Sequence, residues 1–148
     1  MKRTTRFLSI VFSLLIYTTS FAQTDKKDAF FADKNGAIRG YDPVAYFTDG
    51  KPVKGDKTIT FDWNNATWHF ATAAHRDSFA VHPEQYAPQY GGFCAYGWAK
   101  GYPAKIEPEA WHIVNGKLYL NYDLSVQSKW NKKQSAYIKA ADENWPGY

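Results

Sequence analysis

The fold is set by residues 111–120, which read Trp-His-Ile-Val-Asn-Gly-Lys-Leu-Tyr-Leu. Asn-Gly between two apolar runs is the strongest short signal for a β-hairpin, because both residues accept the positive φ of a two-residue turn. The turn places His112 opposite Tyr119 on one face of the hairpin. The other face carries Trp111, Ile113, Leu118 and Leu120. These residues therefore predict a hairpin with one strongly apolar face.

A second hairpin is predicted upstream. Residues 58–63 alternate polar and apolar side chains, as half-buried strands do, and residues 66–72 follow as a second strand. Both residues between them are asparagine, which tolerates a tight turn. The two hairpins predict β structure in both halves of the chain.

The register of this second hairpin follows from a two-residue turn. Phe61 is expected to face Trp68, and Ile59 to face Phe70, on the apolar side. His69 then faces residue 60 on the opposite side. We expect Trp68 and Phe70 in the core and His69 outside it.

Capping residues delimit the predicted helices. Asp42 before a proline predicts a short helix that ends near residues 49–50. Thr72 and Asp123 are N-cap candidates for helices over residues 73–81 and 124–130. One or two helical turns are expected within residues 93–100, and a last helix over 134–145. The predicted class is α+β, with the two β-hairpins forming a small antiparallel sheet and short helices packed against it.

The N-terminal residues predict export. Residues 1–22 combine a basic start, an apolar run of ten residues and a Ser-Phe-Ala ending, which is typical of a cleaved signal peptide. The apolar run is shorter than the ~20 residues of a membrane-spanning helix, so we expect no stable membrane anchor after cleavage. Residues 23–34 are expected to be a loose leader and residues 35–148 a single domain. The predicted location is the periplasm or the extracellular medium.

Cleavage changes the charge balance. Three of the 18 basic residues lie within residues 1–22, which contain no acidic residue, so the remainder carries 15 basic and 14 acidic residues, a net charge of +1. No basic patch interleaved with aromatic residues remains, and we expect no nucleic-acid partner.

Cys94 is the only cysteine. It lies in residues 86–97, a motif rich in aromatic residues and glycine, which reads Tyr-Ala-Pro-Gln-Tyr-Gly-Gly-Phe-Cys-Ala-Tyr-Gly. A lone thiol in an exported protein has no internal partner, which makes it a candidate for redox or metal chemistry. A helix that begins near Phe93 would aim backbone N–H groups at the sulfur and lower the pKa of the thiol. Simple packing is the alternative, because cysteine is also a small apolar residue.

The histidines give no local metal motif. No His-x-x-x-His or Cys-x-x-Cys spacing is present. His75 and His82 are seven residues apart, a rise of ~10.5 Å on one helix, which is too far to share an ion. A metal site would have to be assembled from distant segments.

The chain resembles YHS-domain proteins of the small exported bacterial type. The matching segments cover nearly all of the predicted mature chain and are most specific within residues 86–95. They are residues 40–47 (Gly-Tyr-Asp-Pro-Val-Ala-Tyr-Phe), 67–70 (Thr-Trp-His-Phe), 76–79 (Arg-Asp-Ser-Phe), 83–95, 108–111 (Pro-Glu-Ala-Trp), 116–122 (Gly-Lys-Leu-Tyr-Leu-Asn-Tyr) and 144–146 (Asn-Trp-Pro).

The resemblance implies an association with metals, copper especially. Metal-type members carry three cysteines where this chain has Ala45, Ala71 and His75, so their thiolate framework does not carry over. Some exported members resemble selenoproteins, with selenocysteine at the position of Cys94. The resemblance therefore implies a functional Cys94, and His75 is the only competent replacement for a missing ligand.

Three functions remain open. The first is binding of a soft metal such as a copper ion by Cys94, with His75 as the second ligand. The second is a thiol-dependent oxidoreductase that uses Cys94 as its catalytic residue together with an external thiol. The third is a non-catalytic module that binds a small ligand in an aromatic pocket. That pocket would be formed by Tyr90, Phe93, Tyr96 and Trp98.

The surroundings of the sulfur distinguish these functions. A histidine nitrogen within ~4 Å of Cys94 would favour the metal. Partial exposure at a helix N-terminus would favour redox chemistry. Full burial among aromatic residues would favour packing or the pocket. Whether the chain acts as an enzyme therefore depends on tertiary structure.

Overall fold

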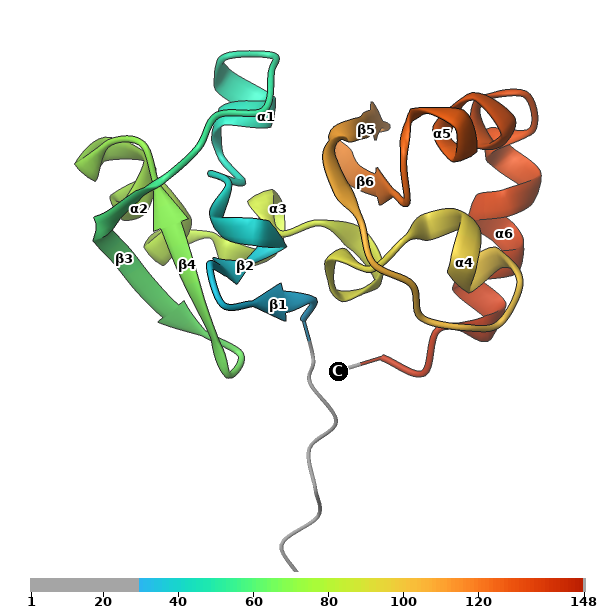
Figure 1. Cartoon of the computed structure of the whole chain (residues 1–148), viewed down its shortest axis with the longest axis horizontal. Coiled ribbons are helices and arrows are strands. Elements are labelled where there is room, and N and C mark those ends of the chain that lie inside the picture. The colour runs from blue at the N-terminus through green and yellow to red at the C-terminus, as the bar shows by residue number, and fades with distance from the viewer. Residues whose placement is uncertain (1–29, 148) are drawn as a thin grey trace, which may run out of the picture.

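The computed structural model describes residues 30–147, which form short strands and helices (Figure 1). The predicted signal peptide, residues 1–22, lies outside the described residues. In chain order the elements are β1 (Ala32–Asp33), β2 (Gly36–Ala37), the 3₁₀ segment η1 (Ile38–Gly40), α1 (Ala45–Thr48), β3 (Asp56–Trp63), β4 (Ala66–Phe70), α2 (Ala73–Val81), α3 (Pro83–Tyr86), the 3₁₀ segment η2 (Gln89–Gly92), α4 (Ala95–Ala99), β5 (Glu107–Val114), β6 (Lys117–Asn121), α5 (Leu124–Asn131) and α6 (Gln134–Asn144).

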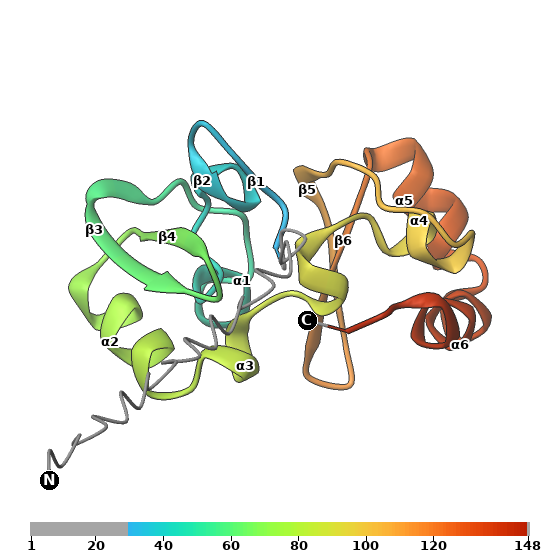
Figure 2. The same cartoon turned by 90° about the horizontal axis from the view of Figure 1, so that it is seen from below.

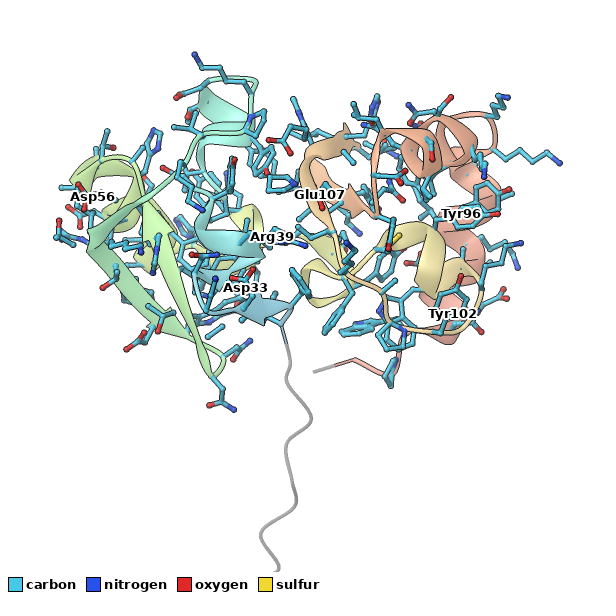
Figure 3. The ribbon with its side chains drawn as sticks, viewed as in Figure 1. Asp33, Arg39, Asp56, Tyr96, Tyr102 and Glu107 are labelled. Carbon is cyan, nitrogen blue, oxygen red and sulfur yellow. The ribbon has the colours of Figure 1, made fainter. Side chains whose placement is uncertain are left out.

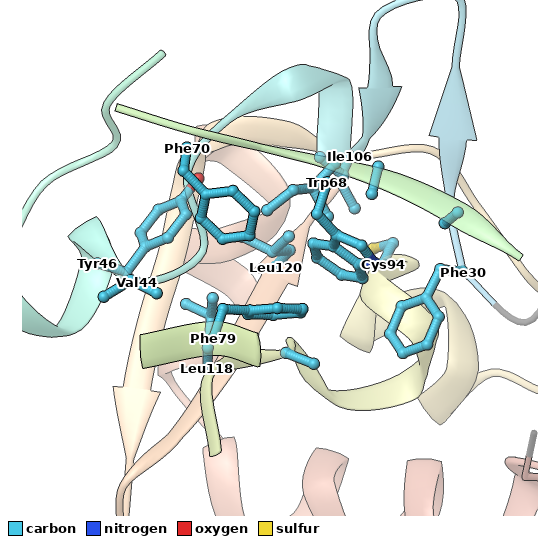
Figure 4. Close-up of a cluster of buried hydrophobic side chains, with 14 residues drawn as sticks. Phe30, Val44, Tyr46, Trp68, Phe70, Phe79, Cys94, Ile106, Leu118 and Leu120 are labelled. Atoms are coloured by element: carbon cyan, nitrogen blue, oxygen red, sulfur yellow. The ribbon is translucent and has the colours of Figure 1, made fainter. Parts of the chain in front are cut away.

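The α+β class is confirmed. The two predicted hairpins, β3–β4 and β5–β6, do not join edge to edge; each is a separate two-stranded antiparallel sheet, and β1–β2 forms a third. The β3–β4 hairpin with α2 lies at one end of the molecule and α4 to α6 lie at the other, with β1–β2 between them (Figures 1 and 2). One core cluster contains Trp68 and Phe70 of the first hairpin together with Leu118 and Leu120 of the second (Figure 4). The hairpins thus meet through their side chains and not through their backbone edges.

The predicted β5–β6 register is confirmed. Trp111 pairs with Leu120, and His112 pairs with Tyr119. The turn residues Asn115 and Gly116 have φ values of 51° and 74°. Positive φ at both positions is the geometry that favours Asn-Gly in a two-residue hairpin turn.

The β3–β4 register is confirmed near the turn and wrong farther away. Phe61 pairs with Trp68, but Phe70 pairs with Asp56 and not with Ile59. A register shift between Asp56 and residue 60 separates the two regions. A bulge of this kind bends a strand at a sheet edge and cannot be read from alternation alone.

His69 is buried, contrary to the prediction, with 9% of its surface exposed. Three glycines cover the face of β4 that the alternation of polar and apolar residues predicted to be solvent-exposed. A Cβ at Gly36 would lie 3.1 Å from the His69 Nε2 atom, and one at Gly40 would lie 3.2 Å from Nδ1. A Cβ at Gly55 would lie 2.6 Å from the His69 backbone carbon. Burial, together with the nearby charges of Lys54 and Lys57, lowers the pKa of His69.

The end of the predicted loose leader belongs to the fold. Phe30 is 2% exposed, and its ring lies 5.0 Å from the ring of Trp68 and 5.1 Å from that of Trp63. The Phe31 amide donates to the Gly91 carbonyl at 2.7 Å. Polar composition predicted a loose leader over residues 23–34, but residues 30–34, the part of it that the structure describes, contribute Phe30 to the core and include β1.

Arg39 connects the first half of the fold to β5. Its Nε donates to the Ile106 carbonyl at 2.8 Å, and its guanidinium lies 3.7 Å from both Asp33 and Glu107. Figure 3 shows Arg39, Asp33 and Glu107 near the middle of the molecule. Among residues 30–147, no helix is long and apolar enough to cross a membrane.

Candidate functional site

Cys94 is the N-cap residue of α4, as the motif suggested. Its Sγ accepts a hydrogen bond from the Gly97 amide at 3.4 Å. The preceding η2 segment contains three successive positive φ values, at Tyr90, Gly91 and Gly92. A Cβ at Gly92 would lie 2.9 Å from Ile38, so the glycine allows η2 to pack closely on η1. The Gly-Gly pair therefore sets the path of the chain that leads to the cysteine.

The sulfur is enclosed by protein. Cys94 is 2% exposed and belongs to the same core cluster as Trp68 and Phe30 (Figure 4). Its Sγ–H points to the Asn121 Oδ1 atom at 3.8 Å, and that oxygen also accepts from the Tyr96 amide at 3.2 Å. The thiol thus lies between the start of α4 and the end of β6.

Two physical effects on the thiol oppose each other. Burial raises the pKa of Cys94, whereas the backbone amides of Gly97, Tyr122 and Tyr96 lower it. Burial is the larger effect, and the pKa is raised overall. The expectation that Cys94 ionises readily is wrong, because a helix start stabilises a thiolate less than the loss of water destabilises it here.

His75 does not lie with Cys94. Its Nδ1 is 2.7 Å from the Asp42 Oδ2 atom, and its Nε2 is 3.3 Å from the Thr48 Oγ1 atom. None of these atoms contacts the sulfur, and α2 and α4 lie at opposite ends of the molecule in both views (Figures 1 and 2). Within residues 30–147, no group of three or more histidine, cysteine or carboxylate side chains is arranged to hold a metal ion.

The four aromatic residues predicted to line a pocket pack against other rings. Their ring centroids lie 5.8 Å apart for Tyr90 and Tyr119, 5.7 Å for Phe93 and Phe31, 5.0 Å for Tyr96 and Tyr137, and 4.9 Å for Trp98 and Trp145. Side chains of this part of the chain, including Tyr96, are drawn in Figure 3. The four residues therefore help to build the packing around α4 and α6, and sequence alone could not distinguish this role from ligand binding.

A hollow of about 440 Å³ lies between the β5–β6 turn and α6. It is lined by Val114, Asn115, Ser135, Ile138, Lys139, Asp142 and Glu143. None of these was predicted as a site residue. The amphipathic pattern of residues 134–145 indicates which face of the helix packs inward, and it gives no signal that the hairpin turn lies beside this helix.

Tyr90 links the predicted aromatic set to this hollow. Its hydroxyl donates to the Asp142 Oδ1 atom at 2.8 Å and lies 3.3 Å from the Ile138 carbonyl. The pKa of Tyr90 is raised, chiefly by burial and then by the Asp142 carboxylate. The tyrosine therefore keeps its proton and holds the carboxylate in position.

Comparison of the chain with models of known protein families gives no match, and comparisons with curated proteins and with solved structures give none either. The resemblance to YHS-domain proteins stays a prediction.

Proposed function

We propose that this protein is an exported module that binds a small ligand in the hollow between the β5–β6 turn and α6. The volume of about 440 Å³ is the observation that carries the proposal. Small-molecule sites in proteins commonly occupy ~300–1,000 Å³. They combine an apolar surface with a few fixed polar groups. This hollow, which is open to solvent, has apolar lining residues and one carboxylate held by a buried tyrosine.

The chemistry of the lining indicates the class of ligand. Val114 and Ile138 supply apolar contact area, and Asp142 and Glu143 supply carboxylates. Lys139 also lines the hollow, but its ammonium is paired with Glu143. The Asp142 carboxylate is the charged group of the lining that is left to bind a ligand, and the Tyr90 hydroxyl holds it in position. This combination favours a small amine with an apolar body, because a carboxylate binds a cationic donor more strongly than a neutral one.

Amide shifts in a two-dimensional NMR titration with tyramine test this proposal. Tyramine is a small aromatic amine that serves as a probe of the expected class. We expect shifts confined to residues 114–116 and 135–143. Ser135→Trp should fill the hollow and abolish them. Ala136→Trp should leave them unchanged, because Ala136 is exposed on the same helix but does not line the hollow. Shifts that survive in Ser135→Trp, or none at millimolar tyramine, would reject the proposal.

A second candidate function is thiol chemistry at Cys94, favoured by the backbone amides of Gly97, Tyr122 and Tyr96 near its sulfur. Such donors would stabilise a thiolate once water or a small oxidant reached it. A hydroperoxide would transfer one oxygen to the sulfur, giving a sulfenic acid and an alcohol. Two external thiols would then restore Cys94 and leave as a disulfide with one water molecule. Copper fits less well, because no second soft ligand among the described residues contacts the sulfur.

Alkylation kinetics separate these roles of the thiol. If the Cys94 thiol is buried and purely structural, iodoacetamide should modify it only as fast as the protein unfolds. Urea should then accelerate the reaction. Modification of the folded protein that is faster than unfolding would support thiol chemistry. Protection of that reaction by one equivalent of Cu(I) would return support to metal binding.

A further inference from the structure

Asp42, His75 and Thr48 form a hydrogen-bonded chain that neither the ligand-binding hollow nor Cys94 uses. The Asp42 Oδ2 atom lies 2.7 Å from His75 Nδ1, and His75 Nε2 lies 3.3 Å from Thr48 Oγ1. The three residues come from the segment before α1, from α2 and from the end of α1. A carboxylate, an imidazole and a hydroxyl in this order are the arrangement by which proteins activate a hydroxyl nucleophile.

Several hydrogen bonds hold the Asp42 carboxylate in place. The Asp42 side chain is fully buried, and its Oδ1 accepts from the Val44 and Ala45 amides at 2.9 and 3.3 Å. Its Oδ2 accepts from the Ala71 amide at 2.8 Å as well as from His75. A carboxylate whose oxygens accept from three backbone amides is placed to accept from His75 as well. It therefore requires the proton of the neutral imidazole to be on Nδ1.

That tautomer determines what the other nitrogen does. With Nδ1 protonated, Nε2 of the neutral ring carries a lone pair and is one of three acceptors within reach of the Thr48 hydroxyl. The His75 side chain is 16% exposed and Thr48 is exposed, so a small molecule in solvent can reach the hydroxyl. Thr48 Oγ1 also lies 2.8 Å from Asp49 Oδ1 and 3.3 Å from the Val44 carbonyl, two acceptors that compete for its proton.

We propose that Thr48 is a nucleophile for small activated carboxylic esters, with His75 as its general base and Asp42 as a positioning residue. The Thr48 oxygen forms a bond to the carbonyl carbon while its proton moves to His75 Nε2. The bond to the leaving alcohol breaks, and that alcohol takes the proton from His75. Water then attacks acyl-Thr48 by the same route, releasing the acid and restoring the hydroxyl. The net reaction consumes one ester and one water and yields one acid and one alcohol.

A purely structural role is the competing explanation. Asp42 joins the start of α1 to the start of α2, and His75 could simply strengthen that connection. Such a role requires no accessible hydroxyl on Nε2 and predicts no covalent product. The two roles therefore differ in chemistry and can be separated without measuring stability.

The test incubates the full chain with p-nitrophenyl acetate and follows both nitrophenolate release and the intact mass. In protein quenched with acid during turnover, we expect an acetyl group that peptide mapping locates on Thr48. His75→Gln should slow acetylation by about 100-fold or more, the lower range of general-base contributions. His82→Gln is the matched control, since His82 is an exposed histidine at the end of the same helix, and it should react like the unaltered protein.

Three further variants test the proposal if His75→Gln fails to fold. Thr48→Val should remove the adduct, whereas Thr48→Ser should retain it, and neither change touches the core because Thr48 is exposed. Asp49→Asn should raise the rate, because it weakens the competing acceptor for the hydroxyl proton. An acetyl group located only on lysines, or an acetylation rate unchanged in Thr48→Val, would overturn the proposal.

Discussion

At the scale of single residues, Cys94 acts as a helix cap. Cys94→Ala removes the acceptor for the Gly97 amide and should lower the free energy of unfolding by about 1 kcal/mol, the usual cost of a lost N-cap. Cys94→Ser keeps an acceptor at that position and should cost less than Cys94→Ala. Urea unfolding of the three proteins measures the difference. An alanine variant as stable as the parent would show that the cap contributes nothing.

His69 is the residue whose burial gives the clearest pH dependence. Its pKa is lowered in the folded protein, first by burial and then by Lys54 and Lys57. As the pH falls below about 6.5, the unfolded chain therefore binds a proton that the folded protein does not. The stability that the neutral ring contributes is present above that pH and is lost as the pH falls through the lowered pKa.

His69→Gln tests this linkage. The free energy of unfolding, measured between neutral pH and about pH 5, should fall less steeply in the variant than in the parent. His112→Gln is the control for the loss of a histidine side chain, since His112 is exposed on the other hairpin. Equal slopes in His69→Gln and the parent would mean that His69 titrates normally in the folded protein.

At the scale of elements, the approach of β3 to β4 depends on Gly55. A Cβ there would lie 2.6 Å from His69 backbone and Cβ atoms, which cannot move away as a flexible side chain would. Gly50 offers the opposite case, because it has a φ of +64° and nothing within 4 Å of the same added atom. Alanine variants of these two glycines therefore separate two costs of replacing a glycine. Gly55 reports the lack of space for a side chain, and Gly50 reports the left-handed backbone.

We expect Gly50→Ala to lower the free energy of unfolding by about 1–2 kcal/mol, the cost of left-handed backbone for an L-residue. Gly55→Ala should cost about 3 kcal/mol or more, because overpacking against backbone forces the strand to move. Thermal or urea unfolding of both variants measures the two costs. If Gly50→Ala lowers the free energy of unfolding more than Gly55→Ala does, Gly55 does not lie as close to His69 as the structure places it.

At the scale of the whole molecule, Phe30 ties the N-terminal segment into the core between Trp63 and Trp68. Phe30→Ala should cost about 3–5 kcal/mol, as truncation of a large buried aromatic residue does. Lys34→Ala, an exposed change in the same predicted leader, should change stability by less than about 0.5 kcal/mol. Chemical unfolding of the two variants is the measurement. A small effect of Phe30→Ala would indicate that residues 30–34 are a loose leader, as the sequence predicted.

The elements that sequence predicted well are those specified by neighbouring residues. The Asn-Gly turn aligned Trp111 with Leu120, and Thr72 and Asp123 cap α2 and α5 as expected. Turn and cap preferences act over three or four residues, so they are present in the unfolded chain as well. The position of Cys94 at the start of a helix belongs to the same category.

The remaining features depended on tertiary structure. Alternation along β4 predicted an exposed His69, but Gly36, Gly40 and Gly55 cover it. Composition predicted a free N-terminal segment, but Phe30 is buried. In both cases a segment distant in the chain covers the side chain, and local periodicity carries no information about which segment that is.

The candidate sites divide in the same way. From the sequence alone, the cysteine, its helix start, both hairpins and the α+β class were determined, because each rests on contacts within a few residues. Only the tertiary structure decided that the thiol is enclosed and its pKa raised by burial, that Asp42 meets His75 across 33 positions, and that a hairpin turn lies beside α6. Burial and long-range pairing depend on how separate elements pack, and packing is a property of the assembled chain.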